Sequence, residues 1–169
     1  MLQEIRICKE LGVPGVTLGV LKQGCRVDVE RTRALVEAAK PMDVTFSRAF
    51  DEVHDLTQAL DDVITSGCTR LLTSGGARNV ELGKEMLTNL VAVANSRIAI
   101  MPGGGVRHQN IVGIVKATGV NMVHSSAMDH GLNVRRESEE ATGNMRIFRD
   151  SFSRLNIDDA PKQLFYKQE

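Results

Sequence analysis

The sequence predicts an α/β protein of about five strand–helix units with parallel strands. Short β-rich apolar runs recur at residues 16–21, 44–50, 71–74, 98–101 and 120–124. The first residues of these runs lie 28, 27, 27 and 22 positions apart, and segments with helical spacing fill the intervals. A strand–helix–strand rhythm of this period indicates parallel strands joined by right-handed helical crossovers.

The helices are predicted from apolar residues three or four positions apart. In chain order, the apolar stripes are Ile5, Cys8 and Leu11; Leu35, Val36 and Ala39, ahead of Pro41; Leu56, Leu60, Val63 and Ile64; Val80, Leu87, Leu90, Val91 and Ala94; and Ile111, Ile114 and Val115. Asp55 and Gln58 form a capping-box pattern before the third stripe. Gly12, Gly67 and Gly119 suit helix C-terminal caps.

Two arrangements of the parallel strands fit these units, an open sheet and a closed barrel. Five parallel strands in 169 residues would form a doubly wound open sheet. Alternatively, they are the last five units of an eight-unit barrel, which needs about 250 residues. Chain length alone favours the open sheet. No strand precedes the first helix, so we expect the chain to begin within its architecture. Residues 1–127 are expected to form this domain. Residues 128–169 are expected to be an irregular charged tail, with one short helix around residues 145–152.

Composition disfavours several functional classes. Lys plus Arg and Asp plus Glu each number 21, so the formal net charge is zero, which disfavours binding to nucleic acid or to an acidic membrane surface. No apolar run approaches the roughly 18 to 20 residues that span a bilayer. Cys8, Cys25 and Cys68 are odd in number and widely spaced. This cysteine usage favours a reducing compartment, and we expect a cytoplasmic protein.

Polar residues follow the second strand at its carboxyl end. In the open sheet and in the barrel alike, ligands bind at the carboxyl ends of the strands. Thr45 and Ser47 are expected on the ligand side, with Arg48 and Asp51 at the rim. Arginine offers a planar fork for a carboxylate or phosphate, and Asp51 would hold that fork or act as a base. The alternative is an Arg–Asp pair that only pins the loop.

Glycine-rich turns follow the next two strands. Ser74 and Gly75 end the third strand, and Gly103, Gly104 and Gly105 follow the fourth. Such turns let backbone N–H groups approach an anion. A tight strand-to-helix turn that binds nothing is the alternative.

The fifth strand ends with His124 and Ser125. His124 would serve as a metal ligand or proton carrier, and Ser125 would help to hold an anion. A hydrogen-bonded packing histidine is the alternative. Met122 points to the same side as His124, and a thioether–imidazole pair suits Cu(I). However, Met122 lies deeper in the strand and is expected in the core.

Four ordered segments resemble the CutC copper-homeostasis family. They are VTFSRAFD at residues 44–51, LLTSG at 71–75, MPGGG at 101–105 and VHSSA at 123–127, and the resemblance extends over about residues 12–128. It implies a (β/α)8 TIM-type barrel, of which about five units are present, in place of the open sheet. It also implies a cytoplasmic protein that handles Cu(I). The family has three earlier units, with cysteines near the early strands, and a histidine where this chain has Ser47.

Three functions stay open at this point. The first is copper homeostasis with Cu(I) as the ligand. The second is an enzyme that acts on a small anionic, for example phosphorylated, metabolite, with Arg48, Asp51 and His124 as catalytic residues. The third is a non-catalytic assembly subunit. Because a partial barrel leaves strand edges unpaired, we expect a homo-oligomer or an edge-paired assembly.

Overall fold

The computed structural model describes residues 1–126 and the backbone of residues 163–166. Its helices are α1 (Leu2–Glu10), α2 (Val29–Ala39), the 3-10 helix η1 (Arg48–Glu52), α3 (Leu56–Thr65), α4 (Lys84–Ala94) and α5 (Ile111–Thr118). Its strands are β1 (Gly15–Leu18), β2 (Leu21–Lys22), β3 (Arg26–Val27), β4 (Asp43–Phe46), β5 (Arg70–Thr73), β6 (Ala99–Pro102), β7 (Met122–Ser125) and β8 (Gln163–Tyr166). Strands and helices alternate as predicted from the apolar periodicity.

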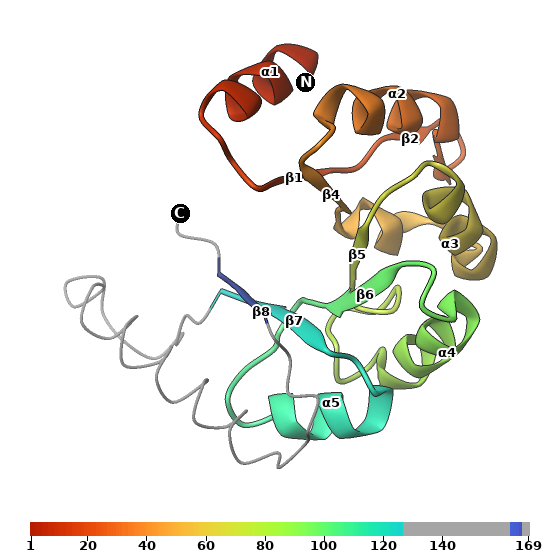
Figure 1. Ribbon diagram of the computed structural model, residues 1–169. Coiled ribbons are helices and arrows are strands. Elements are labelled where there is room, and N and C mark those ends of the chain that lie inside the picture. Colours follow the sequence, from red (N-terminus) through yellow and green to blue (C-terminus); the bar gives the residue numbers. More distant parts are fainter. Residues whose placement is uncertain (127–162, 167–169) are drawn as a thin grey trace, which may run out of the picture.

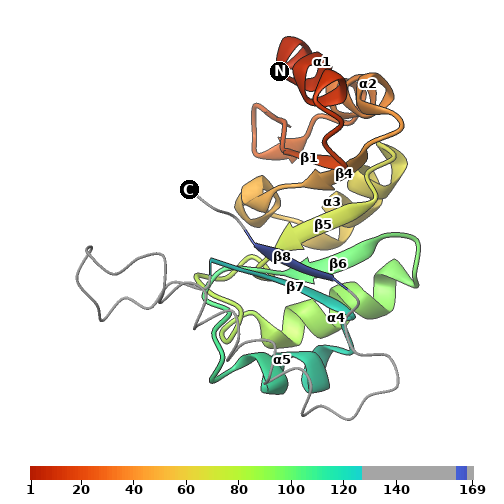
Figure 2. The same cartoon turned by 60° about the vertical axis from the view of Figure 1, so that its left-hand side comes forward.

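The strands form an open arc with helices on its outer side (Figure 1). Strands β1, β4, β5 and β6 make a parallel sheet in that order, β7 lies beside β6, and β7 pairs in parallel with β8. Figure 2 shows the same strands one below another after rotation. Every α-helix that the structure describes follows the outer side of the arc, whereas a doubly wound sheet carries helices on both faces. The predicted TIM-barrel-type repeat is therefore confirmed, and the open sheet favoured by chain length is wrong.

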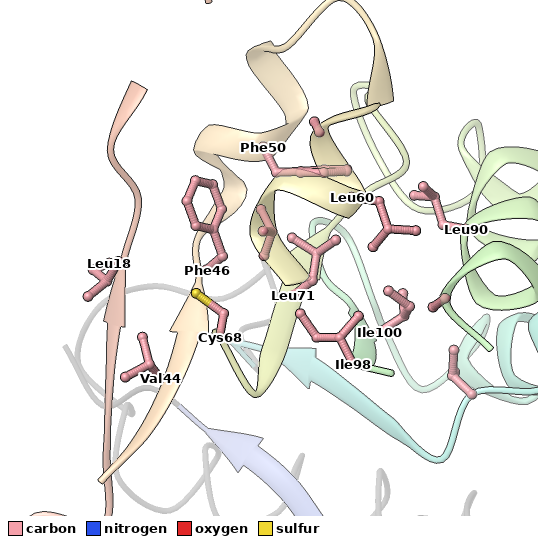
Figure 3. Close-up of a cluster of buried hydrophobic side chains, with 14 of the residues drawn as sticks. Leu18, Val44, Phe46, Phe50, Leu60, Cys68, Leu71, Leu90, Ile98 and Ile100 are labelled. Carbon is pink, nitrogen blue, oxygen red and sulfur yellow. The ribbon is translucent and has the colours of Figure 1, made fainter. Parts of the chain in front are cut away.

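The hydrophobic core lies between the sheet and the helices. Leu18, Phe46, Leu71 and Ile100 stand in register on the four paired strands, and all four are buried. Figure 3 shows this row of side chains together with Leu60 and Leu90, which come from α3 and α4. Burying one side chain of this size contributes roughly 1.5–3 kcal/mol, so the row fixes which face of the sheet meets the helices.

The opposite, concave side of the sheet is its inner face. Since side chains alternate along a strand, the neighbours of the core residues point to this face. Thr45, Leu72 and Met101 are three of them, one from each of β4, β5 and β6. Arg70 also lies on this face, and its Nη2 atom is 2.5 Å from Oδ2 of Asp43. The inner face thus mixes apolar, hydroxyl and charge-paired side chains.

The predicted helix caps are present. The Asp55 side chain accepts a 3.0 Å hydrogen bond from the Gln58 backbone N–H at the start of α3. The Gln58 side chain donates to Asp62 instead of back to the cap. Gly67 and Gly119 adopt φ angles of +86° and +70° after α3 and α5, a region that glycine occupies without steric cost.

Two predicted strands end early. The strand predicted over residues 16–21 stops at Leu18, and a short hairpin of β2 and β3 follows. A Cβ atom on Gly19 would lie 2.2 Å from Oγ of Ser47, so only glycine fits where the chain leaves the sheet. The strand predicted over residues 44–50 stops at Phe46 because Ser47 Oγ accepts a hydrogen bond from Ala49 N–H and starts η1.

Helix α1 and the tail show two further differences from expectation. Leu11, expected on the buried side of α1 with Ile5, is 74% exposed because the helix ends at Glu10 and Leu11 is its C-cap. Strand β8 lies within the segment that was expected to be irregular. The domain boundary at residue 127 and the helix expected around residues 145–152 lie outside the described residues. None of the helices described is long and apolar enough to cross a membrane.

Candidate functional site

The carboxyl ends of β4, β5, β6 and β7 form a rim on which several predicted residues meet. Nη2 of Arg48 donates a 2.8 Å hydrogen bond to Ser74 Oγ, which joins the loops after β4 and β5. A Cβ atom on Gly104 would lie 3.0 Å from Cζ of Arg48, and one on Gly103 would lie 3.4 Å from Cβ of His124. These five residues therefore form a chain of contacts across four successive strand ends.

Asp51 holds this rim together. Its side chain is 6% exposed, and Oδ2 accepts a 2.7 Å hydrogen bond from Nε of Arg48. Thr73 Oγ1 and Gly76 N–H donate to Oδ1, while Ser74 N–H lies 3.1 Å from both oxygens. With both oxygens occupied, Asp51 ties η1 to the turn after β5 and orients the Arg48 guanidinium.

The Arg48 guanidinium has more donors than its two hydrogen bonds use. A guanidinium has five N–H donors in a rigid plane. Two of them bond to Asp51 and Ser74, and the other three have no acceptor within the described part of the chain. A guanidinium edge presents parallel N–H donors at the spacing of two carboxylate or phosphate oxygens. The Arg48 side chain is 42% exposed.

In the turn after β6, Gly104 lies against Arg48 and Gly105 lies beside Asn79. Gly104 and Gly105 have φ angles of +103° and +82°, which favour glycine. Among the residues that the structure describes, their backbone N–H groups have no acceptor. Gly103 N–H donates to Thr73 O at 2.9 Å and continues the pairing of β5 with β6. Gly103 N–H is therefore used within the sheet, whereas Gly104 and Gly105 N–H are not paired within the described residues.

The turn after β5 uses its polar groups internally. Gly75 N–H donates to Thr73 Oγ1 at 2.9 Å. A Cβ atom on Gly75 would lie 2.6 Å from Gly83 O, so glycine permits this close approach of two backbone segments. Ser74 Oγ accepts from Arg48 and lies 2.9 Å from Asp51 Oδ2 and 2.5 Å from Ala77 O. Ser74 and Gly75 therefore shape the rim and position Arg48.

The other residues predicted for the site have these positions in the structure. Thr45 is buried on the inner face of β4, and Ser47 caps η1. His124 is half-buried on β7. Ser125 is buried, and its Oγ donates to Val106 O at 2.8 Å. Because Ser125 is two residues after buried Val123, it points to the core side of β7.

The cysteines are spread through the fold. Cys8 is half-buried in α1, Cys25 is exposed in the β2–β3 hairpin with a φ angle of +49°, and Cys68 is buried. Burial raises the pKa of the Cys68 thiol to about 12. Across residues 1–126, no three side chains among His, Cys, Asp and Glu gather in a way that would hold a metal ion.

Sequence reasoning missed two residues of the rim network. Thr73 and Gly76 both donate to Asp51. Thr73 directly precedes Ser74 in a β-rich run, where threonine is common in strands for packing reasons. The spacing of Arg48 and Asp51 was the stronger signal, because residues three apart share one side of a helical turn.

Comparison with known proteins identifies relatives of one family. Residues 1–129 match the CutC family. A CutC family protein of Chromobacterium violaceum is 46% identical over 127 residues, covering 75% of this chain and 51% of that protein. One of Vibrio vulnificus is 46% identical over 126 residues, covering 73% and 50%. The chain spans about half the length of the curated relatives it matches.

A solved structure agrees with this relationship. The crystal structure of CutC from Streptococcus agalactiae, which is provisionally named a copper homeostasis protein, has a TM-score of 0.69 and 31% sequence identity to this chain. The similarity covers 73% of this chain and 60% of that one. It supports the TIM-barrel-type arrangement of the described strands and helices.

Proposed function

Because the chain belongs to the CutC family, we propose that it serves copper homeostasis by handling Cu(I) in the cytoplasm. The name given to the similar protein of Streptococcus agalactiae supports this role. The widely spaced cysteines suit a reducing compartment, in which copper is present as Cu(I). Met122 and His124, two residues apart on one face of β7, supply a thioether and an imidazole, and both ligand types suit copper.

Titration of the chain with Cu(I) against a chromogenic chelator, under anaerobic reducing conditions, tests this role. We expect the chain to withdraw Cu(I) from the chelator. Replacing Cys8, Cys25 and Cys68 by serine, one at a time, tests whether a thiolate takes part. Uptake no greater than that of an unrelated protein of equal cysteine and methionine content would refute the proposal.

The rim geometry favours a second function, recognition of a small carboxylate or phosphate ester. The observation that carries it is the guanidinium of Arg48, which Asp51 and Ser74 hold in place, while its other donors have no acceptor among residues 1–126. Gly104 lies against that guanidinium, and its N–H group is a further donor for an anion oxygen. In TIM barrels phosphate often binds at the carboxyl ends of the strands, and the turn at residues 103–105 lies at the carboxyl end of β6.

The reaction that we propose at this rim is proton transfer to or from the bound anion. We propose His124 as the proton carrier, since it lies beside Gly103 at the same rim and histidine titrates near neutral pH. Arg48 would bind the anion and is the second catalytic residue of the proposal. For Asp51, the donors on both oxygens favour a positioning role over that of a base.

A thermal-shift panel of phosphate esters and small carboxylates tests anion recognition. A ligand at about 100 times its Kd stabilises the folded state by about 2.7 kcal/mol. We expect a rise in melting temperature with at least one of these compounds and its loss in Arg48→Lys, because lysine has no planar fork. The matched control is Arg97→Lys, which changes an arginine that precedes β6 at the opposite end of the sheet. No response to any compound would refute the anion proposal.

We also propose that copies of the chain associate through the β1 side of the arc. In the sheet that the structure describes, β1 is an edge strand. Edge strands pair with other chains unless something covers them. Ile7 and Leu11 are exposed on the adjoining α1 segment, so an apolar surface borders this edge.

A further inference from the structure

Two methionines and a histidine face the same side of neighbouring strands. Ile100 on β6 and Val123 on β7 are buried in the core. Because side chains alternate along a strand, Met101, Met122 and His124 point to the inner face. Met122 is half-buried and does not belong to the hydrophobic core, so the expectation that it packs in the core is wrong. Met101 is 3% exposed and also lies outside the core cluster.

The position of β7 beside β6 makes these residues neighbours across the two strands. A Cβ atom on Gly103 would lie 3.4 Å from Cβ of His124, so these two residues are lateral neighbours. Strands β6 and β7 lie side by side in Figures 1 and 2. Met101 and Met122 each lie two residues before that pair, and are therefore lateral neighbours as well. Adjacent strands are about 5 Å apart, a distance that two flexible thioether side chains can close.

We propose that Met101, Met122 and His124 form a three-coordinate Cu(I) site on the inner face. Thioether sulfur is a soft ligand that selects Cu(I), and imidazole also suits copper. This proposal rests on the proposed handling of Cu(I) and names the side chains that perform it. An imidazole has two nitrogens, so one binds the metal while the other keeps a hydrogen-bond partner.

The surroundings of these residues suit a singly charged soft ion. A Cβ atom on Gly103 would lie 2.4 Å from Cδ1 of Leu72, so an apolar side chain lies over the turn beside His124. Arg70, which is earlier on β5, has its charge balanced by Asp43. An apolar, charge-balanced shell limits access of water to a bound metal. None of these three ligands is ionised when it binds, so the site adds only the charge of the ion.

Methionine methyl resonances give a residue-resolved test. The chain is labelled at its methionine methyl groups, titrated with Ag(I) as a redox-stable substitute for Cu(I), and then with Cu(I) itself. We expect the signals of Met101 and Met122 to shift together and saturate at one ion per chain. The signal of Met86, which lies exposed on α4, stays in place and serves as the internal control. Met101→Leu and Met122→Leu assign the two signals.

Competition with a chelator then measures affinity. Loss of one ligand in Met122→Leu is expected to weaken Cu(I) binding by at least about tenfold, since changes in the shell around the ligands already cost that much. Met86→Leu is expected to bind within about twofold of the unchanged chain, because an exposed single thioether lies outside the proposed ligand set. Leucine has nearly the volume of methionine, so both variants should fold.

The outcomes separate this site from the function on which it rests. If the unchanged chain takes up no Cu(I), the proposed copper function is refuted together with the site. If it takes up Cu(I) while the signals of Met101 and Met122 stay in place, the copper function stands and this site is wrong. Equal affinity in Met122→Leu and the unchanged chain also overturns the site alone.

Discussion

Asp51 determines where Arg48 can point, because one buried carboxylate accepts hydrogen bonds from the arginine and from the turn after β5. The ion pair was visible in the sequence as a three-residue spacing. The donors from Thr73 and Gly76 depend on how β5 is placed against η1, which is a tertiary contact. Sequence reasoning therefore found the pair but not the network that fixes it.

Asp51→Asn should lower both stability and anion binding. The change removes a charge-assisted partner of Arg48 inside a buried network, and hydrogen bonds to charged groups contribute about 1.5–3 kcal/mol each. Urea denaturation measures the stability loss, and the thermal-shift panel measures anion binding. The matched control is Asp61→Asn, since Asp61 is the half-exposed partner of Arg97. Exposed pairs contribute roughly 0–1 kcal/mol. Equal losses in the two variants would contradict a structural role for Asp51.

Cys68 and Cys25 should differ in thiol reactivity. Cys25 is exposed, whereas burial raises the pKa of Cys68 from its ordinary value of 9.0 to about 12. Thiolates, not thiols, react with alkylating agents. At pH 8, mass spectrometry should find Cys25 modified first and Cys68 protected until the chain unfolds. Rapid modification of Cys68 in the folded chain would contradict its burial.

The same pKa shift makes a small part of the stability depend on pH. The folded chain retains the Cys68 proton at pH values where the unfolded thiol has lost it. The contribution is therefore complete below about pH 9 and is lost as the pH rises toward about 12. Denaturation from pH 8 to pH 11 should show a steeper decline for the unchanged chain than for Cys68→Ala.

For Ser125, a strand that is one residue longer than predicted changes the role of the side chain. The strand predicted over residues 120–124 leaves Ser125 beyond its end, on the rim. The observed strand β7 includes Ser125, and alternation turns its hydroxyl to the core side, where it donates to Val106 O. Strand ends are set by tertiary pairing, which hydrophobic alternation does not encode.

At the level of elements, the apolar stripes predicted the helices because their 3.6-residue period is a local property of the chain. The β2–β3 hairpin and η1 were missed. The hairpin follows Gly19, where the lack of a side chain lets the backbone leave the sheet. The 3-10 helix η1 follows Ser47, whose side chain caps it. The sequence did not predict these two elements because they depend on contact between the end of β1 and the end of β4, which a local pattern does not reveal.

The start of α3 offers a test of its cap. Asp55→Ala should cost about 0.5–2 kcal/mol of unfolding free energy, because it removes the acceptor of the Gln58 backbone N–H. Gln58→Ala should cost less, since the Gln58 side chain bonds only to Asp62 on the helix surface. Urea denaturation of both variants measures the difference. A larger loss in Gln58→Ala would indicate that the reciprocal capping box forms after all.

At the level of the whole molecule, chain length was a poor guide to whether the strands form an open sheet or part of a barrel. The number of residues favoured an open doubly wound sheet, whereas the helices cover one side of an arc (Figure 1). Periodicity counts strand–helix units but is the same for both closures. The family motifs at the strand ends supplied the distinction, because they are specific to one arrangement.

An open arc should associate with other copies of the chain. Size-exclusion chromatography with light scattering should show a mass above that of one 18.5 kDa chain. The double variant Ile7→Lys/Leu11→Lys should shift the chain toward the monomer, because charge on the border of an edge strand opposes pairing. The control Leu82→Lys changes an equally exposed leucine far from β1 and should leave the mass unchanged. A well-folded, purely monomeric chain would contradict this expectation.

The rim site is the central claim, and an NMR titration of the nitrogen-labelled chain with inorganic phosphate tests it most directly. The titration reports on the Arg48 Nε–H group and on the backbone amides of Gly104 and Gly105 in one spectrum. We predict saturable shifts that are largest at these three groups, and we predict that the shifts of the Gly104 and Gly105 amides disappear in Arg48→Lys. Shifts that are largest elsewhere, or that persist unchanged in Arg48→Lys, would contradict the account.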